Sequence, residues 1–455
     1  MTGPRLRIKA LAFWALLCLL MFIVLEAASY VLVNHTVPAR IAARVGRGNL
    51  DFHLANRKRL QTHRLNPAPN PVGTYESPSV SVGEFKMFHP VLGWDYPPNS
   101  SYQGIDNIAY SHGAEGERRT CTSYPTTLIA TYGDSFTYCA NVRDEETWQT
   151  FLAHRLRSNI LNFGVGGYGT DQAVLKYEHQ NRNNPEIVML CIWPENINRI
   201  ANIYRPFYTY DDPLNLTKPL FVKGPDGCSL VSNPLKTRDD ITKLVDPVFL
   251  GELAKLDYWY QFDKDLPSLS FPWTLSLFRW RKIVLKQLKL ASPKALHRYF
   301  APSYPANLYE EDGPFASMCH VVDRFIATAR TRGSAPVIVI VPNKDFVREF
   351  TDHGVSRASR LVDYLSSRAY PHIDAIRAMA DMKPTGTQLE KWYCDHATAA
   401  GNQVLAGILS RYLTDNFGKL VGPRFQESGG VTAPSEPLSP QGSATVDTIR
   451  FPVYE

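Results

Sequence analysis

The chain has 455 residues, of which 44% are hydrophobic and 12% aromatic, which is ample for a sizeable buried core. The formal net charge is +6, and no run of Lys and Arg is dense enough to indicate a nucleic acid as the main partner. The balance of charge therefore argues against a nucleic-acid-binding protein.

The first predicted element is a long apolar stretch, residues 10–33, which follows a short segment, residues 1–9. About 20 apolar residues are needed to cross a bilayer as a helix. Glu26 is the only charge in this stretch, and we predict a transmembrane signal anchor. A cleaved signal peptide is the alternative, with small residues at 27–29 near the cleavage site. The anchor is favoured because the apolar run continues past those residues.

The flanking charges do not decide the orientation of this span. Basic residues occur on both sides of it in similar numbers, so the positive-inside count is close to a tie. A long C-terminal domain after one early apolar segment is the usual plan of a signal anchor. We therefore expect residues 1–9 in the cytoplasm and the rest of the chain on the periplasmic or extracellular side.

Cysteine usage agrees with that location but does not define a disulfide framework. Of seven cysteines, one lies in the predicted span and six lie beyond it. An even number permits disulfides, but six cysteines allow 15 pairings. Cys191 lies in an apolar strand-like run and is predicted to be a buried thiol.

Composition divides the remainder into three parts. Residues 34–83 are polar and rich in Pro and Arg, as in a stalk, and residues 426–455 are rich in Ser, Pro and Gly, as in a disordered tail. Residues 84–425 form the predicted domain. Within it, residues 200–316 are crowded with aromatics and prolines, and we interpret them as an insertion that caps one edge of a sheet.

Strand-like and helix-like segments alternate through the predicted domain. Short, continuous apolar runs are typical of strands buried on both faces, and amphipathic segments separate them. This alternation predicts an α/β fold with a parallel sheet covered by helices on both faces. The predicted strands are 126–132, 159–165, 186–193, 335–342 and, more weakly, 372–376, and the predicted helices are 147–156, 318–330 and 399–413.

The most informative motif is Gly133-Asp134-Ser135-Phe136, directly after the first predicted strand. Ligands of doubly wound sheets bind just beyond the carboxyl ends of the strands, so Ser135 stands where chemistry is expected. Backbone N–H groups at such a turn can hold an oxyanion. The tripeptide alone also fits a serine that caps a helix, but the preceding strand and the later motifs favour a nucleophile.

A glycine-rich run, residues 162–172, follows the second predicted strand. Gly164, Gly166 and Gly169 fit the G-x-G-x-x-G pattern of dinucleotide-binding loops. Two features count against a nucleotide site. The run follows the second strand rather than the first, and the nearest acidic residue, Glu195, lies a little beyond the end of the next strand.

The last motif is Tyr393-Cys394-Asp395-His396, followed by small residues and an apolar helix. A histidine suits the role of base because its unperturbed pKa lies near neutrality. Zinc is another use of such a cluster, but three candidate ligands in a row lack the spacing of a zinc site.

Together these motifs resemble the SGNH (GDSL-like) hydrolases, in which Ser, Gly, Asn and His occur in this chain order. The resemblance covers about residues 84–195 and 317–415. It implies a flavodoxin-like doubly wound parallel sheet and a serine esterase that requires no metal and no cofactor.

The resemblance also implies a role for individual residues. Ser135 is the expected nucleophile and His396 the expected base. The expected oxyanion hole consists of the Ser135 N–H, the Gly167 N–H and the side-chain amide of Asn196, with Asn198 as the reserve for Asn196.

Two positions depart from the family pattern. The third motif usually reads Asn-Asp, whereas this chain has Asn196-Ile197. The family places an Asp two or three residues before the His, whereas here Asp395 is adjacent to His396. A complete triad with Asp395 and a Ser–His dyad supported by a backbone carbonyl therefore both stay open.

The expected function is ester hydrolysis through an acyl-enzyme. A segment of mixed aromatic and basic residues, 271–290, either docks on anionic headgroups or packs on the sheet, and we favour packing. Either arrangement puts the site near the membrane, where acylated glycans and lipids are the expected substrates. An O-acyltransferase and a non-catalytic glycan- or lipid-binding protein are the alternatives.

Overall fold

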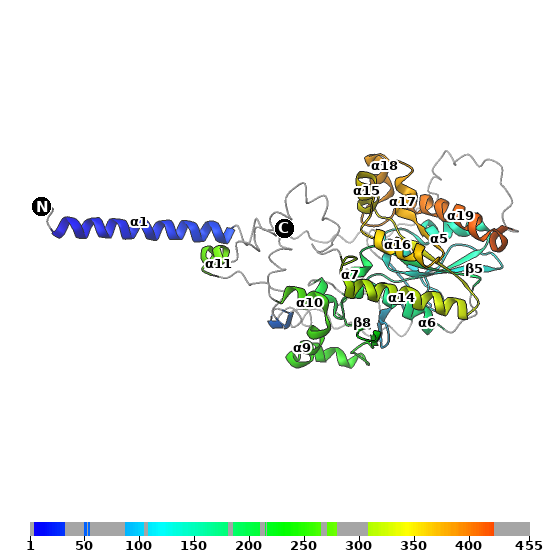
Figure 1. Ribbon diagram of the computed structural model, residues 1–455, viewed down its shortest axis with the longest axis horizontal. Coiled ribbons are helices and arrows are strands. Elements are labelled where there is room, and N and C mark those ends of the chain that lie inside the picture. The colour runs from blue at the N-terminus through cyan, green and yellow to red at the C-terminus, as the bar shows by residue number, and fades with distance from the viewer. Residues whose placement is uncertain are drawn as a thin grey trace, which may run out of the picture.

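A five-stranded parallel sheet forms the centre of the structure (Figure 1). The structure is a computed structural model, and it describes residues 4–31, 50–51, 53–54, 87–103, 108–180, 185–209, 214, 216–264, 271–279 and 308–422.

Every neighbouring pair of strands in this sheet is parallel, and the strand order is β11-β10-β7-β5-β6. Numbered along the chain, this order is 2-1-3-4-5, the flavodoxin-like arrangement. The predicted fold class is confirmed, and each predicted strand agrees with the structure to within two residues. The strands are β5 (Thr127–Gly133), β6 (Asn159–Gly164), β7 (Ile187–Ile192), β10 (Ala335–Ile340) and β11 (His372–Asp374).

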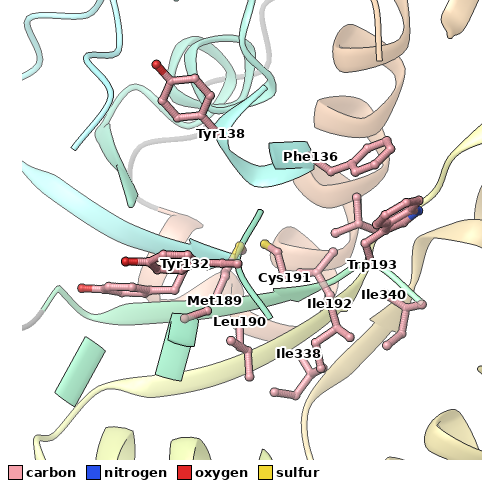
Figure 2. Close-up of a cluster of buried hydrophobic side chains, with 14 of the residues drawn as sticks. Tyr132, Phe136, Tyr138, Met189, Leu190, Cys191, Ile192, Trp193, Ile338 and Ile340 are labelled. Carbon is pink, nitrogen blue, oxygen red and sulfur yellow. The ribbon is translucent and has the colours of Figure 1, made fainter. Parts of the chain in front are cut away.

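Helices cover both faces of the sheet, which explains the continuous apolar runs in its strands (Figure 1). Helices α5 (Trp148–Leu156) and α19 (Ala399–Val421) pack together on one face, and α6 (Thr170–His179) and α14 (Asp312–Thr331) pack together on the other. Every residue of the central strand β7 is buried. Figure 2 shows its side chains against those of β10.

The remaining elements of the sheet domain are short. Two small hairpins precede the sheet, and Arg118 N–H donates to Asn162 O at 2.8 Å, which ties them to the edge strand β6. These elements are β1 (Met87–His89), β2 (Gly93–Asp95), β3 (Ser101–Gln103), β4 (Ala109–Ser111), α4 (Ser135–Tyr138), the 3-10 helix Asp144–Glu146, α7 (Asn196–Ile200), α15 (Lys344–His353), α16 (Ser359–Ser367), α17 (Ala375–Ala380) and α18 (Gly386–Trp392).

The segment interpreted as an insertion has a small core of its own, formed by Ile203, Phe207 and Leu250 with their neighbours. It contacts the sheet domain through polar bonds as well. Trp259 Nε1–H donates to Asn198 O at 2.8 Å, and Lys218 forms an ion pair with Asp171 of α6. Its elements are α8 (Arg205–Tyr208), β8 (Leu220–Gly224), β9 (Gly227–Val231), the 3-10 helix Asp239–Val245, α9 (Pro247–Leu256), α10 (Tyr258–Asp263) and α11 (Trp273–Arg279).

Helix α1 (Pro4–Val31) contains the predicted span. Its part Ala12–Val31 is long and apolar enough to cross a membrane, and little of it is buried. Length and composition do not distinguish an anchor from a signal sequence, so that choice stays a prediction. The predicted stalk, except residues 50–51 and 53–54, and the predicted tail lie outside the described residues.

Two further predictions concern side chains that the structure describes. All seven cysteines lie within the described residues as free thiols, and Cys191 is buried as predicted. The expectation that residues 271–290 pack on the sheet is wrong for their described part, because α11 contacts α1 instead. Residues 280–290 lie outside the described residues.

Candidate active site

Ser135 is the first residue of α4 and is separated from the end of β5 by Asp134 alone, at the carboxyl edge of the sheet. Asp134 caps this short helix, and its Oδ1 accepts from Phe136 N–H at 3.0 Å. A glycine is required at position 133 because the helix turns back closely onto the strands. A Cβ there would overlap Thr137 Oγ1 and lie 2.8 Å from Cys191 O. The turn leaves Ser135 partly exposed while Asp134 is buried.

His396 lies near the C-terminal end of the domain and contacts Ser135 in the folded structure. Its Nε2 lies 2.9 Å from Ser135 Oγ. The turn that carries it is closed by Cys394 N–H, which donates to His396 O at 2.9 Å, and it leads into α19. The imidazole packs against Phe136 with 4.7 Å between ring centroids. The structure therefore brings the predicted nucleophile and the predicted base together.

Burial lowers the pKa of His396 to about 4, and the neighbouring charges of Asp134 and Asp395 act in the opposite direction. The imidazole is therefore neutral at neutral pH. When Nε2 accepts the hydroxyl proton of Ser135, the ring carries its own proton on Nδ1. A neutral imidazole in this tautomer is the form that a general base requires.

The second ring nitrogen has no orienting partner among the described residues. His396 Nδ1 is buried and makes no hydrogen bond. Asp395 is exposed, and neither its carboxylate nor a backbone carbonyl accepts from Nδ1. The structure thus forms the Ser–His pair but brings neither of the two expected orienting groups to Nδ1.

Asn196 begins α7 just beyond β7 and lies beside the Ser135 turn. Its Nδ2 donates to Asp134 Oδ2 at 2.9 Å and, more weakly, to Tyr168 O at 3.4 Å. Its Oδ1 accepts from Trp193 N–H at 3.0 Å. For the reserve residue, Asn198, the backbone carbonyl accepts from Trp259 Nε1–H at 2.8 Å. Of the two asparagines, only Asn196 has a described hydrogen bond with the Ser135 turn.

Gly167 lies in the loop between β6 and α6, with a left-handed φ of +85° that favours glycine. A Cβ there would lie 2.7 Å from Leu214 Cδ1. The loop is held by Trp94, whose Nε1–H donates to Gly166 O at 3.2 Å. Its Tyr168 carbonyl accepts from Asn196, so the loop and Asn196 are neighbours.

The same loop contacts argue against a dinucleotide site. Phosphate-binding glycines leave open backbone for the ligand, whereas here Leu214 and Trp94 lie against Gly167. Gly164 serves close packing, since a Cβ there would overlap Tyr138 N of α4. Glu195 is buried in an ion pair with Arg199, so its carboxylate is occupied within the protein.

A buried charge cluster surrounds Asp134, and it is not among the features predicted from the sequence. Arg199 Nη1 lies 3.4 Å from Asp134 Oδ2 and donates to Tyr168 O at 3.0 Å, and its Nε lies 2.7 Å from Glu195 Oε2. Burial raises the pKa of Glu195 to about 7, although Arg199 opposes this shift, and Tyr208 O–H donates to the same carboxylate. The only signal in the sequence was the spacing of Asn196 and Arg199, which places both on one face of a helix.

Comparisons with known proteins leave the family unassigned. No model of a known protein family matches the chain, and no curated protein matches its sequence. The resemblance to SGNH hydrolases therefore depends on the short motifs named above.

Some solved structures are similar to the chain, with low sequence identity and low TM-scores. A protein described as lipolytic and of the G-D-S-L family, from Desulfitobacterium hafniense, is 9% identical, with a TM-score of 0.31, over 63% of this chain and 100% of that one. A G-D-S-L lipolytic family member from Veillonella parvula is 10% identical, with a TM-score of 0.28, over 65% and 100%.

An acetylxylan esterase from Geobacillus stearothermophilus, solved as a catalytic mutant, is 9% identical, with a TM-score of 0.30, over 65% of this chain and 96% of that one. Scores this low do not bear on the activity of the present chain. Its function must be inferred from its own site.

Proposed function

We propose that the protein is a membrane-anchored serine esterase that acts through an acyl-enzyme on acylated glycans or lipids. The observation that carries this proposal is the 2.9 Å contact between His396 Nε2 and Ser135 Oγ at the carboxyl edge of the sheet. A serine hydroxyl in hydrogen-bond contact with a neutral imidazole is the arrangement that activates a serine nucleophile.

In the proposed reaction, Ser135 Oγ attacks the carbonyl carbon of the ester while His396 Nε2 takes the hydroxyl proton. The tetrahedral intermediate then collapses. His396 returns the proton to the oxygen of the leaving alcohol, and the acyl group stays on Ser135 as an ester. Water attacks this acyl-enzyme with the help of the same base and releases the acid and free Ser135.

The oxyanion of the intermediate is proposed to accept from Ser135 N–H, Gly167 N–H and the Asn196 amide. The hydrogen bonds of Asn196 support its part. One N–H is held by Asp134 at 2.9 Å, whereas the bond to Tyr168 O is long, at 3.4 Å. A developing negative charge is a better acceptor than a distant carbonyl, so the second N–H can move to the oxyanion at little cost.

The base is proposed to work without an orienting carboxylate. Packing against Phe136 and the closed turn before α19 hold the imidazole of His396. The exposed position of Asp395 supports a Ser–His dyad over a triad.

A non-catalytic glycan- or lipid-binding protein is the alternative to an enzyme. Such a protein has no need to keep a hydroxyl and an imidazole in hydrogen-bond contact, so the Ser135–His396 geometry favours the enzyme. An O-acyltransferase would use the same acyl-enzyme with a hydroxyl acceptor in place of water.

The direct test is covalent labelling by a fluorophosphonate probe, detected by in-gel fluorescence and mass spectrometry of the labelled peptide. We expect labelling of Ser135 that is abolished in Ser135→Ala and strongly reduced in His396→Ala. Ser366→Ala is a matched control, since Ser366 Oγ also contacts a histidine, His372, at 3.4 Å, but on the exposed surface. Unlabelled Ser135 in the folded protein would overturn the esterase proposal.

Product analysis then separates the two acyl-transfer reactions. With an acylated glycan and an unacylated glycan acceptor, a hydrolase releases the free acid, whereas a transferase forms the newly acylated acceptor. We expect free acid as the main product, and dominant transfer would move the assignment to an acyltransferase.

The proposed location depends on α1, whose apolar part is the one described helix suited to a span. With residues 1–9 in the cytoplasm, the domain that carries Ser135 lies on the periplasmic or extracellular side. Protease added to cells with an opened outer envelope should digest this domain, and full protection would reverse the orientation.

A further inference from the structure

Helix α11 lies apart from the sheet and beside the C-terminal end of α1 (Figure 1). None of its residues is buried. Two side-chain contacts join the helices. Ser29 Oγ and Thr274 Oγ1 are 3.0 Å apart, and the rings of Tyr30 and Trp273 meet edge to face at 5.8 Å. A helix of the insertion is thus docked on the apolar N-terminal helix.

Glu26 forms the polar centre of this contact. It is the only charged residue in the apolar stretch 10–33, yet it is buried. Its Oε2 accepts from Trp273 N–H at 2.6 Å and its Oε1 from Thr274 N–H at 3.0 Å. The first N–H groups of a helix have no partner within it, and a carboxylate there is stabilised by the helix dipole. The carboxylate in the apolar stretch therefore has a structural partner in α11.

Large apolar side chains on α11 and just before it are mostly exposed. Phe271, Leu275 and Phe278 are 68%, 61% and 66% exposed. Leu275 and Phe278, three residues apart, lie along one stripe of α11, and Phe271 precedes the helix by two residues. Apolar side chains of α1 are similarly exposed beside it, for example Leu25 at 51%. Both of these contacting helices therefore present exposed apolar side chains.

We propose that α11 is a second membrane-contacting element, which lies in the bilayer interface beside α1 with Phe271, Leu275 and Phe278 among the lipid acyl chains. This inference depends on the proposed membrane span of α1. Seven residues are too few to cross a bilayer but suit a helix that lies in its interface. The occupant that covers these apolar side chains is lipid, because α11 is docked on the helix proposed to span the membrane, whose own apolar side chains are exposed. The insertion is then held to the membrane at a second point.

The test uses the full chain with a photo-crosslinking benzophenone amino acid at single positions, in phosphatidylethanolamine–phosphatidylglycerol vesicles that contain a clickable lipid. Leu275 and Phe278 report on α11, and Leu20 reports on α1. Val355, which is 59% exposed in the sheet domain after α15, is the matched control for an exposed apolar position. We expect lipid adducts at Leu20, Leu275 and Phe278 and only background adducts at Val355.

The outcomes distinguish this inference from the proposal on which it depends. Adducts at Leu20 with only background at Leu275 and Phe278 would overturn the interfacial position of α11 and leave the anchor intact. Background adducts at Leu20 as well would overturn the anchor and this inference together.

A variant of Glu26 tests the contact between the two helices. Glu26→Ala should lower the adduct yield at Leu275 several-fold and leave the yield at Leu20 unchanged, because α11 loses the cap that docks it on α1. An unchanged yield at Leu275 in Glu26→Ala would overturn the role of Glu26 in holding α11 at the membrane.

Discussion

At the residue scale, the activity of the proposed site depends on the orientation and the protonation state of the His396 imidazole. Within the described part of the chain, His396 has a partner at Nε2 and none at Nδ1. We predict that Asp395→Asn lowers kcat less than tenfold, whereas a well-placed triad carboxylate contributes about 10⁴-fold. The measurement is kcat of Asp395→Asn beside that of Ser135→Ala in one assay. Equal losses in the two variants would establish Asp395 as a triad member.

A second residue-scale prediction concerns pH. A base must be unprotonated to act, and burial lowers the pKa of His396 to about 4. The acid limb of kcat/KM should therefore fall near pH 4 rather than near 6.5. Because the charge of Asp395 raises the pKa of His396, Asp395→Asn should move this limb to still lower pH. Circular dichroism at each pH separates titration from unfolding, and a limb near 6.5 in folded enzyme would contradict the lowered pKa of His396.

The third residue-scale prediction concerns Asn196 and Asn198. Asn196→Ala should lower kcat by about a hundredfold or more, as loss of one oxyanion donor does elsewhere. Asn198→Ala is the control, since the backbone carbonyl of Asn198, rather than its side chain, accepts from Trp259. A near-normal rate for Asn196→Ala together with a crippled Asn198→Ala would transfer the role to Asn198.

At the scale of elements, the start of α19 sets the position of the imidazole. Gly401 lies in its first turn, where a Cβ would overlap the carbonyl oxygen of Trp392. The backbone of Trp392 cannot move aside as a flexible side chain can. An added Cβ at position 401 must therefore shift the turn that carries His396. We predict that Gly401→Ala lowers kcat at least tenfold and costs about 1–3 kcal/mol of stability, as overpacking does.

Gly407 in the same helix is the matched control. A Cβ there would meet only Arg155, at 3.8 Å, an ordinary contact. Gly407→Ala should leave kcat unchanged and stabilise the protein by about 0.5–1 kcal/mol, since Gly is the poorer helix former. Comparison of kcat and the free energy of unfolding in both variants checks the prediction, and equal effects would show that α19 does not position His396.

At the scale of the whole molecule, a buried ion pair joins the insertion to the sheet domain. Lys218 and Asp171 are fully buried, and burial raises the pKa of Asp171 and lowers that of Lys218, each shift opposed by the partner's charge. We predict that Lys218→Met destabilises the protein by about 3–5 kcal/mol because it leaves a buried carboxylate unpaired.

Lys218→Met combined with Asp171→Leu provides the control, because removal of both charges leaves no unpaired group. This double variant should regain most of the lost stability. Denaturant unfolding measures all three proteins. A single variant as stable as the parent chain would show that the pair does not hold the insertion in place.

The sequence by itself determined the sheet and the candidate residues for its chemistry. Buried parallel strands must be continuously apolar and must end in turns, so β5, β6, β7 and β10 and the motifs after them were visible as local patterns. Local spacing also pointed to Ser135 and His396, because each stands beside an element that the sequence marks plainly.

Only the tertiary structure decided how these residues meet. The cluster of Asp134, Arg199 and Glu195, the contact of His396 with Ser135 and the docking of α11 on Glu26 all join segments far apart in the chain. Such contacts depend on the directions of side chains and on burial. Neither can be predicted from the spacing of residues within one segment. Local sequence patterns therefore identified the helices and strands, and tertiary packing determined which side chains contact one another and which charge they carry.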